Sequence, residues 1–373
     1  MGYTAEMSGE PKRIHIVEPT LSSEAGHCHS FLLSFCRGRG EGDPEIAVYA
    51  SRGALLPELS GTGAHVIPYF DRRLRRLQSF LLYRKLLSAP GRIFVSTAGR
   101  TDMVLLGWAA SGVIPAGKVF LYFHWVRPSP GKAAFFRRFA AHHPGVVVVA
   151  PTSSVASVFR ECGFPDVRVV PYPITRTMPH APLPGGEFRH LLYAGAARRD
   201  KGFGRVVALV SSMAGQRLSI PFVVQASPDH YGKLDDEAHQ GISRLRESSA
   251  SWLRVVTETL EAGEYQALFR GGVCLQPYAR DEFRDRVSGV TLDALSAACP
   301  VVVTEGTWMA RLAERYGAGV AVADLSPSFL LEAAREVIAD YGRFSAGAAE
   351  AGRALQEEHD ARRLYREVAE GIQ

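Results

Sequence analysis

The sequence lacks the long apolar segments and cysteine patterns that define several large protein classes. Its 373 residues contain no run of about 18 apolar residues, so we expect no transmembrane helix. The first residues, MGYTAEMSGEPKR, are polar and do not form the apolar stretch of a signal peptide. The five cysteines are odd in number and form no CxxC pair, which disfavours a disulfide framework or a zinc site. We therefore expect reduced, mostly buried thiols in a cytoplasmic protein.

Several recognition motifs are also missing. No GxGxxG pattern follows the first strand candidate, which disfavours a dehydrogenase, and no DxD triplet is present to hold a metal ion. No aromatic-basic RNA motif or zinc finger occurs, so we expect no nucleic-acid partner. What remains is a globular composition, with 46% apolar and 22% charged residues and a net charge of +5. The mild basic bias favours anionic partners such as nucleotide phosphates or anionic lipid.

Short apolar runs alternate with helical patterns along most of the chain. This alternation is typical of parallel sheets with helices on both faces. It predicts an α/β protein of two doubly wound, Rossmann-like domains facing a central cleft, with a ligand at the carboxyl ends of the strands. The strand candidates are 13–19, 45–51, 64–70, 92–98, 118–125, 146–151 and 167–171 in the first half, and 190–196, 222–226, 253–257, 273–277, 301–305 and 319–322 in the second.

A segment rich in proline and glycine separates the two halves. Five prolines and two glycines occur within the sixteen residues 171–186, which excludes a helix or a central strand there. We expect an acceptor domain over 1–175, a linker over 176–188 and a donor domain over 189–350. The remaining residues, 351–373, predict one C-terminal helix. Whether this helix packs back on the first domain stays open.

The segment after residue 272 carries the clearest chemical signal. A short apolar strand leads through a charged loop to Ser288-Gly289, which opens a helix containing Asp293. A helix N-terminus with small residues binds anions because its first amides have no partner within the helix. Asp285 and Asp293 lie eight positions apart across the start of this helix, and a carboxylate there can reach a sugar hydroxyl beside a bound phosphate. The combination suits a nucleotide-diphosphate sugar.

The second domain opens with LLYAGAARRDKG, a strand that ends at small residues and is followed by three cations. Gly195 allows close approach of a ligand to the backbone, and Arg198, Arg199 and Lys201 can neutralise a diphosphate. A solvated charged turn is the alternative interpretation of the same residues.

These motifs resemble the donor domain of the retaining group 1 glycosyltransferases, a family with the GT-B fold. In that family a glycine-rich strand end is followed by an Arg and a Lys that hold the donor phosphates. Gly195 and Lys201 fall on this pattern, and Ala196 occupies the usual Arg position, so the resemblance implies that Arg198 or Arg199 takes its place.

The family's two acidic residues have seven residues between them, and Asp285 and Asp293 keep that spacing. The resemblance implies that Asp285 lies near the transferred sugar and Asp293 near the ribose. Glu282, in Glu282-Phe283, is a rival for the first role. Ser288-Gly289 matches the phosphate-binding helix start.

In the first domain, His124 follows an apolar strand and precedes Trp125. The family often has a histidine here near the reacting sugar, whereas a structural histidine beneath Trp125 is the alternative. Gly26 lies in a loop that resembles the family's first glycine-containing loop, which faces acceptor and donor phosphates. His27 and His29 have no third ligand at a typical zinc spacing, so we expect no metal site.

Two stretches mix basic and apolar residues at helical spacing: DRRLRRLQSFLLYRKLL over 71–87 and GKAAFFRRFAA over 131–141. Amphipathic helices that pack inward with solvated arginines are one interpretation. A surface that docks on anionic lipid is the other.

The resemblance implies a cytoplasmic, metal-independent retaining glycosyltransferase of the kind found in bacterial polysaccharide or glycoconjugate biosynthesis. Its donor would be a nucleotide-diphosphate sugar, its acceptor a glycan or lipid-linked molecule, and it would need no further cofactor. Lys201 and Arg199 would neutralise the leaving diphosphate. Two alternatives stay open: a nucleotide-sugar epimerase or hydrolase on the same scaffold, and a non-catalytic nucleotide-sugar-binding protein.

Overall fold

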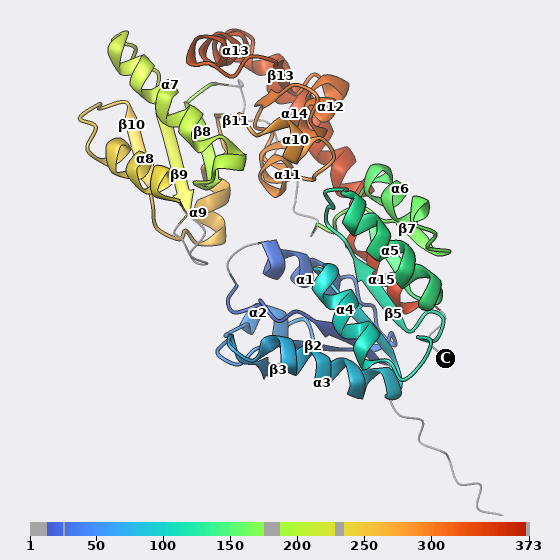
Figure 1. Cartoon of the computed structure of the whole chain (residues 1–373). Coiled ribbons are helices and arrows are strands. Elements are labelled where there is room, and N and C mark those ends of the chain that lie inside the picture. The colour runs from blue at the N-terminus through green and yellow to red at the C-terminus, as the bar shows by residue number, and fades with distance from the viewer. Residues whose placement is uncertain (1–12, 25–26, 175–186, 228–234, 371–373) are drawn as a thin grey trace, which may run out of the picture. The chain divides into compact units, whose positions relative to one another are not determined.

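A computed structural model describes residues 13–24, 27–174, 187–227 and 235–370 (Figure 1). The chain divides into two compact units. Unit 1 comprises Met1–Arg176 and His359–Gln373, and unit 2 comprises Thr177–Glu358. The expected linker over 176–188 lies outside the described residues except for 187 and 188.

Unit 1 is built on a seven-stranded parallel sheet with the strand order β3-β2-β1-β4-β5-β6-β7. The strands are β1 (Arg13–Val17), β2 (Glu45–Ser51), β3 (His65–Phe70), β4 (Arg92–Val95), β5 (Val119–Tyr122), β6 (Val147–Ala150) and β7 (Val167–Val169). The helices are α1 (His27–Arg37), α2 (Pro57–Ser60), α3 (Arg75–Ser88), α4 (Arg100–Ala109), α5 (Pro130–His142), α6 (Ser153–Glu161) and α15 (Ala361–Ala369).

Unit 2 is built on a six-stranded parallel sheet with the order β10-β9-β8-β11-β12-β13 (Figure 1). The strands are β8 (His190–Ala196), β9 (Phe222–Ser227), β10 (Leu253–Val256), β11 (Gly272–Gln276), β12 (Val301–Thr304) and β13 (Gly319–Val322). The helices are the short 3₁₀ helix η1 (Arg199–Lys201), α7 (Phe203–Gly215), α8 (Asp236–Arg246), α9 (Ala262–Ala267), α10 (Arg280–Phe283), α11 (Gly289–Ser296), α12 (Trp308–Tyr316), α13 (Pro327–Ala339) and α14 (Tyr341–Glu358).

The central strands are buried on both faces, as parallel sheets covered by helices require. Every residue of β5, β6, β11 and β12 is buried, and these strands are short runs of mainly apolar residues. The expectation of two doubly wound α/β domains is confirmed, with strand boundaries close to those expected. The expected burial of most thiols also holds, since four of the five cysteines are buried: Cys36, Cys162, Cys274 and Cys299.

The C-terminal region differs from the single helix expected over 351–373. Its first part is the end of α14, and a separate helix, α15, follows a break at His359-Asp360. Asp360 causes this break by capping α15, because its side chain accepts a hydrogen bond from the backbone N–H of Arg362 at 2.9 Å. The helix α15 packs against α1 and buries Leu364 and Val368 in the core of unit 1.

Close packing of α14 against α11 fixes the helix that carries Asp293. Gly352 of α14 lies so close to α11 that a Cβ atom added there would overlap the backbone carbonyl oxygen of Leu295. Only glycine allows this separation of the two helix backbones. The position of α11 therefore depends on a residue about 60 positions away in sequence. That residue must lack a side chain for the two helices to pack this closely.

We predict that Gly352→Ala lowers the free energy of unfolding by about 1–3 kcal/mol, because overpacking forces the two helices apart. Gly342→Ala in the same helix is the matched control, since nothing lies within 4 Å of an added Cβ at that position. It should be neutral or stabilising by up to about 1 kcal/mol through helix propensity. Urea unfolding of both variants measures the difference, and equal effects would contradict the assigned close contact.

Candidate functional site

The candidate residues of unit 2 lie where the winding of its sheet reverses direction. From β8 the chain proceeds outward to β9 on one side, while β11 pairs with β8 on the other side. The connections that leave β8 and β11 therefore run to opposite sides and leave space between them at the carboxyl edge of the sheet. Arg198 and Lys201 follow β8, and Arg286 and Ser288 follow β11.

Three cations gather around one acid at this edge. Arg198 Nε donates to Asp200 Oδ1 at 2.8 Å, and Arg286 Nη1 donates to Asp200 Oδ2 at 3.3 Å. The amine of Lys201 lies over the ring of the buried Tyr278, 5.7 Å from its centroid. We call Arg198, Lys201 and Arg286 the cation cluster. Asp200 offsets only part of the positive charge of this cluster.

The pKa of Lys201 reports the electrostatics of this cluster. Burial lowers the pKa to about 8, and the positive charges of Arg198 and Arg286 add to that effect. The carboxylates of Asp200 and Asp293 act in the opposite direction. A bound anion would therefore relieve a repulsion that is already present in the protein.

Gly195 brings the end of β8 against this cluster. Its φ angle is +111°, and a Cβ atom added there would lie 3.0 Å from Lys201 Nζ and 3.4 Å from Val290 Cγ2. The strand end, the lysine amine and the start of α11 therefore meet at one point. The N–H of Gly195 is held by the side chain of Gln225, whose Oε1 accepts it at 2.8 Å.

The start of α11 has the geometry of an anion site. The Ser288 hydroxyl caps the helix by accepting from the backbone N–H of Thr291 at 3.4 Å. The Thr291 hydroxyl in turn donates to Gln276 Oε1 at 2.6 Å, which ties the first turn to the end of β11. Nothing lies within 4 Å of an added Cβ at Gly289, so the helix opens onto free space.

The structure places the two aspartates of the acidic pair in different surroundings. Asp293 is accessible to solvent, yet enough protein surrounds it to disfavour its charge. Burial raises the pKa of its carboxyl to about 7, while hydrogen bonding from Tyr265 and the charge of Lys201 act in the opposite direction. Asp285 instead forms an ion pair with Arg311 Nη2 of α12 at 3.1 Å. Glu282, its rival, is half-buried on α10.

The structure places the three arginines of this region in different surroundings. Arg199 is exposed in η1, whereas Arg198 and Arg286 contact Asp200. Sequence reasoning did not single out Arg286, although it directly follows Asp285 and lies two positions before the cap Ser288. Its position just before the helix start was the available signal. The loop contains several alternating basic and acidic residues, so this arginine does not stand out among them.

In unit 1, His124 lies at the carboxyl end of β5. Its Nε2 hydrogen-bonds with the backbone oxygen of Ser96 at 2.9 Å, and its ring packs against Phe31, Tyr122 and Tyr172. These contacts fix the orientation of the imidazole. Gly26 lies outside the described residues.

A buried acid that the sequence did not highlight lies beside Ser96. Glu18 follows β1 and is 2% exposed. Its carboxylate accepts from the hydroxyls of Ser96 at 2.8 Å and Thr20 at 2.6 Å. Since β1 and β4 flank the reversal of winding in this sheet, polar groups also meet at the carboxyl edge of unit 1.

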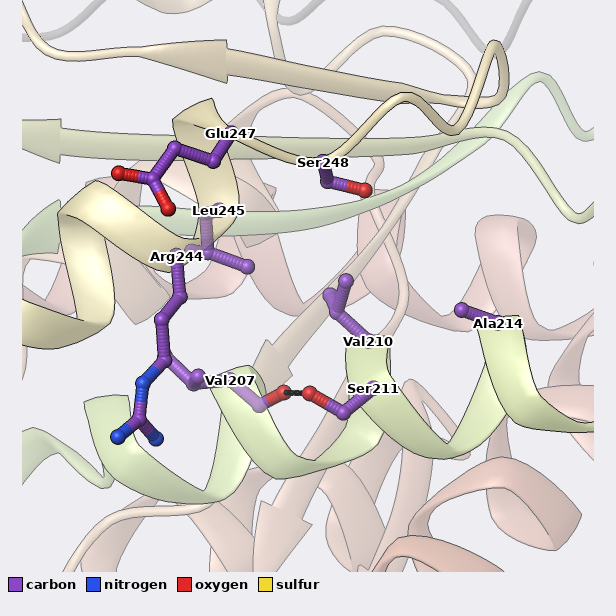
Figure 2. Close-up of a pocket in the computed structure, with 8 residues that line it drawn as sticks. All are labelled: Val207, Val210, Ser211, Ala214, Arg244, Leu245, Glu247 and Ser248. Carbon is purple, nitrogen blue, oxygen red and sulfur yellow. Dashed lines mark hydrogen bonds between the residues drawn. The ribbon is translucent and has the colours of Figure 1, made fainter.

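A pocket in unit 2 lies away from these residues, between α7 and α8 (Figure 2). It is lined by residues of α7 and α8 and of the segment that follows α8: Val207, Val210, Ser211, Ala214, Arg244, Leu245, Glu247 and Ser248. Its lining includes none of the candidate site residues, so we do not propose it as part of the donor site.

Comparisons with known proteins were made by family, by sequence and by structure. No family model matches the chain, and no curated protein matches it in sequence. Among solved structures, HepE (Alr3699) of Anabaena in complex with UDP and glucose is similar over 97% of this chain and 99% of its own, with 14% identity and a TM-score of 0.70.

Two further structures show the same architecture. Sucrose-phosphate synthase from Thermosynechococcus elongatus is similar over 96% of this chain and 99% of its own, with 13% identity and a TM-score of 0.70. WaaG, a glycosyltransferase involved in lipopolysaccharide biosynthesis, has the same coverages, 14% identity and a TM-score of 0.62. Similarity along nearly the full length of each chain shows that this protein has the GT-B fold.

Proposed function

We propose that the protein is a retaining glycosyltransferase that uses a nucleotide-diphosphate sugar. The observation that carries the proposal is the cation cluster at the reversal of winding in unit 2, next to the open N-terminus of α11. Cations and helix amides together suit the two phosphates of the donor. The fold supports this assignment, and HepE, which shares the fold, has been solved in complex with UDP-glucose and with UDP.

The cation cluster would act on the leaving group. Negative charge builds on the diphosphate as the glycosidic bond breaks, and preorganised cations stabilise that charge. We assign this role to Lys201, Arg198 and Arg286, so that Arg286 takes the role first expected for Arg199. Because these charges belong to the chain, the proposal needs no metal ion at the leaving group. Transfer is therefore expected to persist in excess EDTA.

The acidic residues would bind the remaining parts of the donor. Asp293 is proposed to accept hydrogen bonds from the ribose hydroxyls, since it is accessible and lies within the electrostatic reach of Lys201. Asp285 and Glu282 remain the two candidates for orienting the sugar. In unit 1, His124 remains the proposed sugar contact.

The donor can be identified by ligand-induced stabilisation. A ligand that binds only the folded protein raises the midpoint of thermal unfolding by mass action. A panel of UDP-, GDP-, ADP- and dTDP-sugars should yield at least one such shift, and none from any member would contradict the proposal. Product analysis on donor alone separates transfer from the epimerase or hydrolase alternative, because those reactions need no acceptor.

Lys201→Ala should lower kcat by on the order of 10²–10³, because one preorganised charge at the diphosphate is lost. Arg199→Ala is the matched control, since it removes an exposed cation from the same turn, and we expect a much smaller change. Steady-state kinetics on folded variants measures kcat for both and compares the two losses. Equal losses in both would return Arg199 to the leaving-group role.

Asp293 should make donor binding dependent on pH. Its pKa of about 7 means that protonation increases as the pH falls through neutrality, and the protonated carboxyl accepts hydrogen bonds less well. The apparent donor KM should therefore rise as the pH falls below about 7. In Asp293→Asn, KM should be raised throughout and lose this dependence. Asp281→Asn, which changes an acid whose side chain is 91% exposed, serves as the control.

The helix α3 of unit 1 presents apolar residues to solvent. Leu74, at its N-cap, and Leu77 and Leu81 are 55, 57 and 50% exposed, while the opposite side of the helix buries Leu82 and Tyr83. Trp108, on the neighbouring α4, is 71% exposed. Exposed basic residues surround these leucines: Arg72, Arg73, Arg75, Arg76, Arg84 and Lys85.

We infer from this surface that the protein docks on anionic lipid. Inward packing accounts for α5, which buries Phe136 and Phe139 and exposes Arg137 and Arg138, but it leaves the outer leucines of α3 unexplained. Apolar side chains among cations are typical of peripheral membrane contact. Within the described residues, no helix has the length and apolar character to cross a bilayer. Docking would bring a lipid-linked acceptor to the enzyme.

The protein should sediment with anionic liposomes at low salt and be released at high salt, since salt screens the electrostatic attraction. The double variant Leu77→Asn, Leu81→Asn should weaken sedimentation, whereas Leu55→Asn should not. Leu55 is 82% exposed but lies outside this helix, so it controls for loss of an exposed leucine. Equal binding to neutral and anionic liposomes would contradict the electrostatic part of the inference.

A further inference from the structure

Three potential metal ligands from separate segments meet in unit 1. Glu24 precedes α1, His29 lies in the first turn of α1, and Glu58 lies in the first turn of α2. One ligand atom from each lies within 4.8 Å of the other two. His29 Nε2 is 3.8 Å from Glu24 Oε1. We call these residues the Glu–His–Glu triad.

The buried nitrogen of His29 is the observation that points to a ligand. His29 is 3% exposed, and its Nε2 has no hydrogen-bond partner in the described part of the chain. Leaving a buried polar atom unpaired typically costs about 1–3 kcal/mol, so such atoms are rare without a compensating partner. Here the nitrogen faces a carboxylate and has no N–H···O hydrogen bond with it.

The ionisation of His29 fits metal binding better than an ion pair. Burial lowers the pKa of the imidazole, although the negative charges of Glu24 and Glu58 oppose this effect. Burial thus favours the neutral imidazole, in which one ring nitrogen carries a lone pair. A neutral imidazole beside two carboxylates is a donor set for a divalent ion.

We propose that Glu24, His29 and Glu58 bind a divalent transition-metal ion of the zinc class. Bonds of about 2.0–2.2 Å place tetrahedral ligand atoms roughly 3.4 Å apart, so the observed separations need only a small contraction. Three protein ligands leave one position for water. Imidazole nitrogen and carboxylate oxygen suit a divalent ion of the zinc class, whereas a site for Cu(I) or an iron–sulfur cluster would supply thiolates.

Neighbouring contacts already orient part of this site. The backbone N–H of Glu58 donates to Glu24 Oε1 at 2.7 Å, which holds one carboxylate ligand in place. Such second contacts are typical of metal sites, where they fix the direction of the ligand. The ion would add a cross-link between the segment after β1, the helix α1 and the helix α2. The leaving-group chemistry proposed for unit 2 does not use this ion.

The spacing of residues along the chain could not reveal this site. His27 and His29 have no third ligand nearby in sequence, and Glu58 lies 34 positions beyond Glu24. Only the packing of α2 beside α1 brings the second carboxylate to His29.

Calorimetric titration of the EDTA-treated full chain with Zn²⁺ alone tests the proposal. We expect one saturable site in the wild type. Glu58→Gln should weaken it by roughly 100-fold or more, because even changes to residues that only orient ligands cost about 10–100-fold. Glu58 is exposed, so this variant should fold normally. Glu41→Gln, an exposed glutamate outside the triad, is the matched control and should bind as the wild type does.

Thermal unfolding and Co²⁺ absorption test the same site independently of the titration. Zn²⁺ should raise the thermal midpoint of the wild type and of Glu41→Gln but not of Glu58→Gln. Co²⁺ should give a visible absorption band that His29→Asn abolishes. Absence of a saturable site, or equal affinity in Glu58→Gln, would overturn the proposal and indicate adventitious surface binding. Neither result bears on the donor site, because nucleotide binding is measured separately on the same metal-free protein.

Discussion

The reversal of winding within each sheet is the constraint on which the candidate sites depend. Parallel strands require crossover helices, and a sheet covered on both faces must change direction once. In unit 2 this happens between β8 and β11, and in unit 1 between β1 and β4. The connections diverge there, so polar residues can gather at the carboxyl edge without being packed into the core. Lys201 and Arg286 occupy one such place, and Glu18 occupies the other.

The cation cluster exists because a single acid holds like charges together. Arg198 and Arg286 would repel each other and Lys201, and Asp200 offsets part of this repulsion through contacts with both arginines. The remaining positive charge is fixed in space before any anion arrives. Preorganisation of this kind is what electrostatic catalysis needs, because the protein does not have to reorganise during the reaction.

Much of the fold could be predicted from the sequence, but only part of the site. Strands such as β6 and β12 are continuous apolar runs bounded by turn residues, so local patterning alone defines them. Lys201, Ser288 and Asp293 follow from short motifs at strand ends and helix starts. The position of Arg286 before the helix start is visible in the sequence, but its contact with Asp200, 86 positions earlier, is not. The ion pair between Asp285 and Arg311 likewise depends on how α12 packs.

Burial of ionisable groups links the two proposals. Burial lowers the pKa of Lys201 to about 8 and also lowers the pKa of His29, so in both cases the surrounding protein disfavours the positively charged form. Burying such groups costs stability, and structural reasons alone do not favour it when an apolar side chain could fill the same space. A bound phosphate would offset the cost in unit 2, and a divalent cation would offset it in unit 1. The sign of the uncompensated charge indicates the ligand in each case: cations gather where an anion is proposed, and carboxylates gather where a metal ion is proposed.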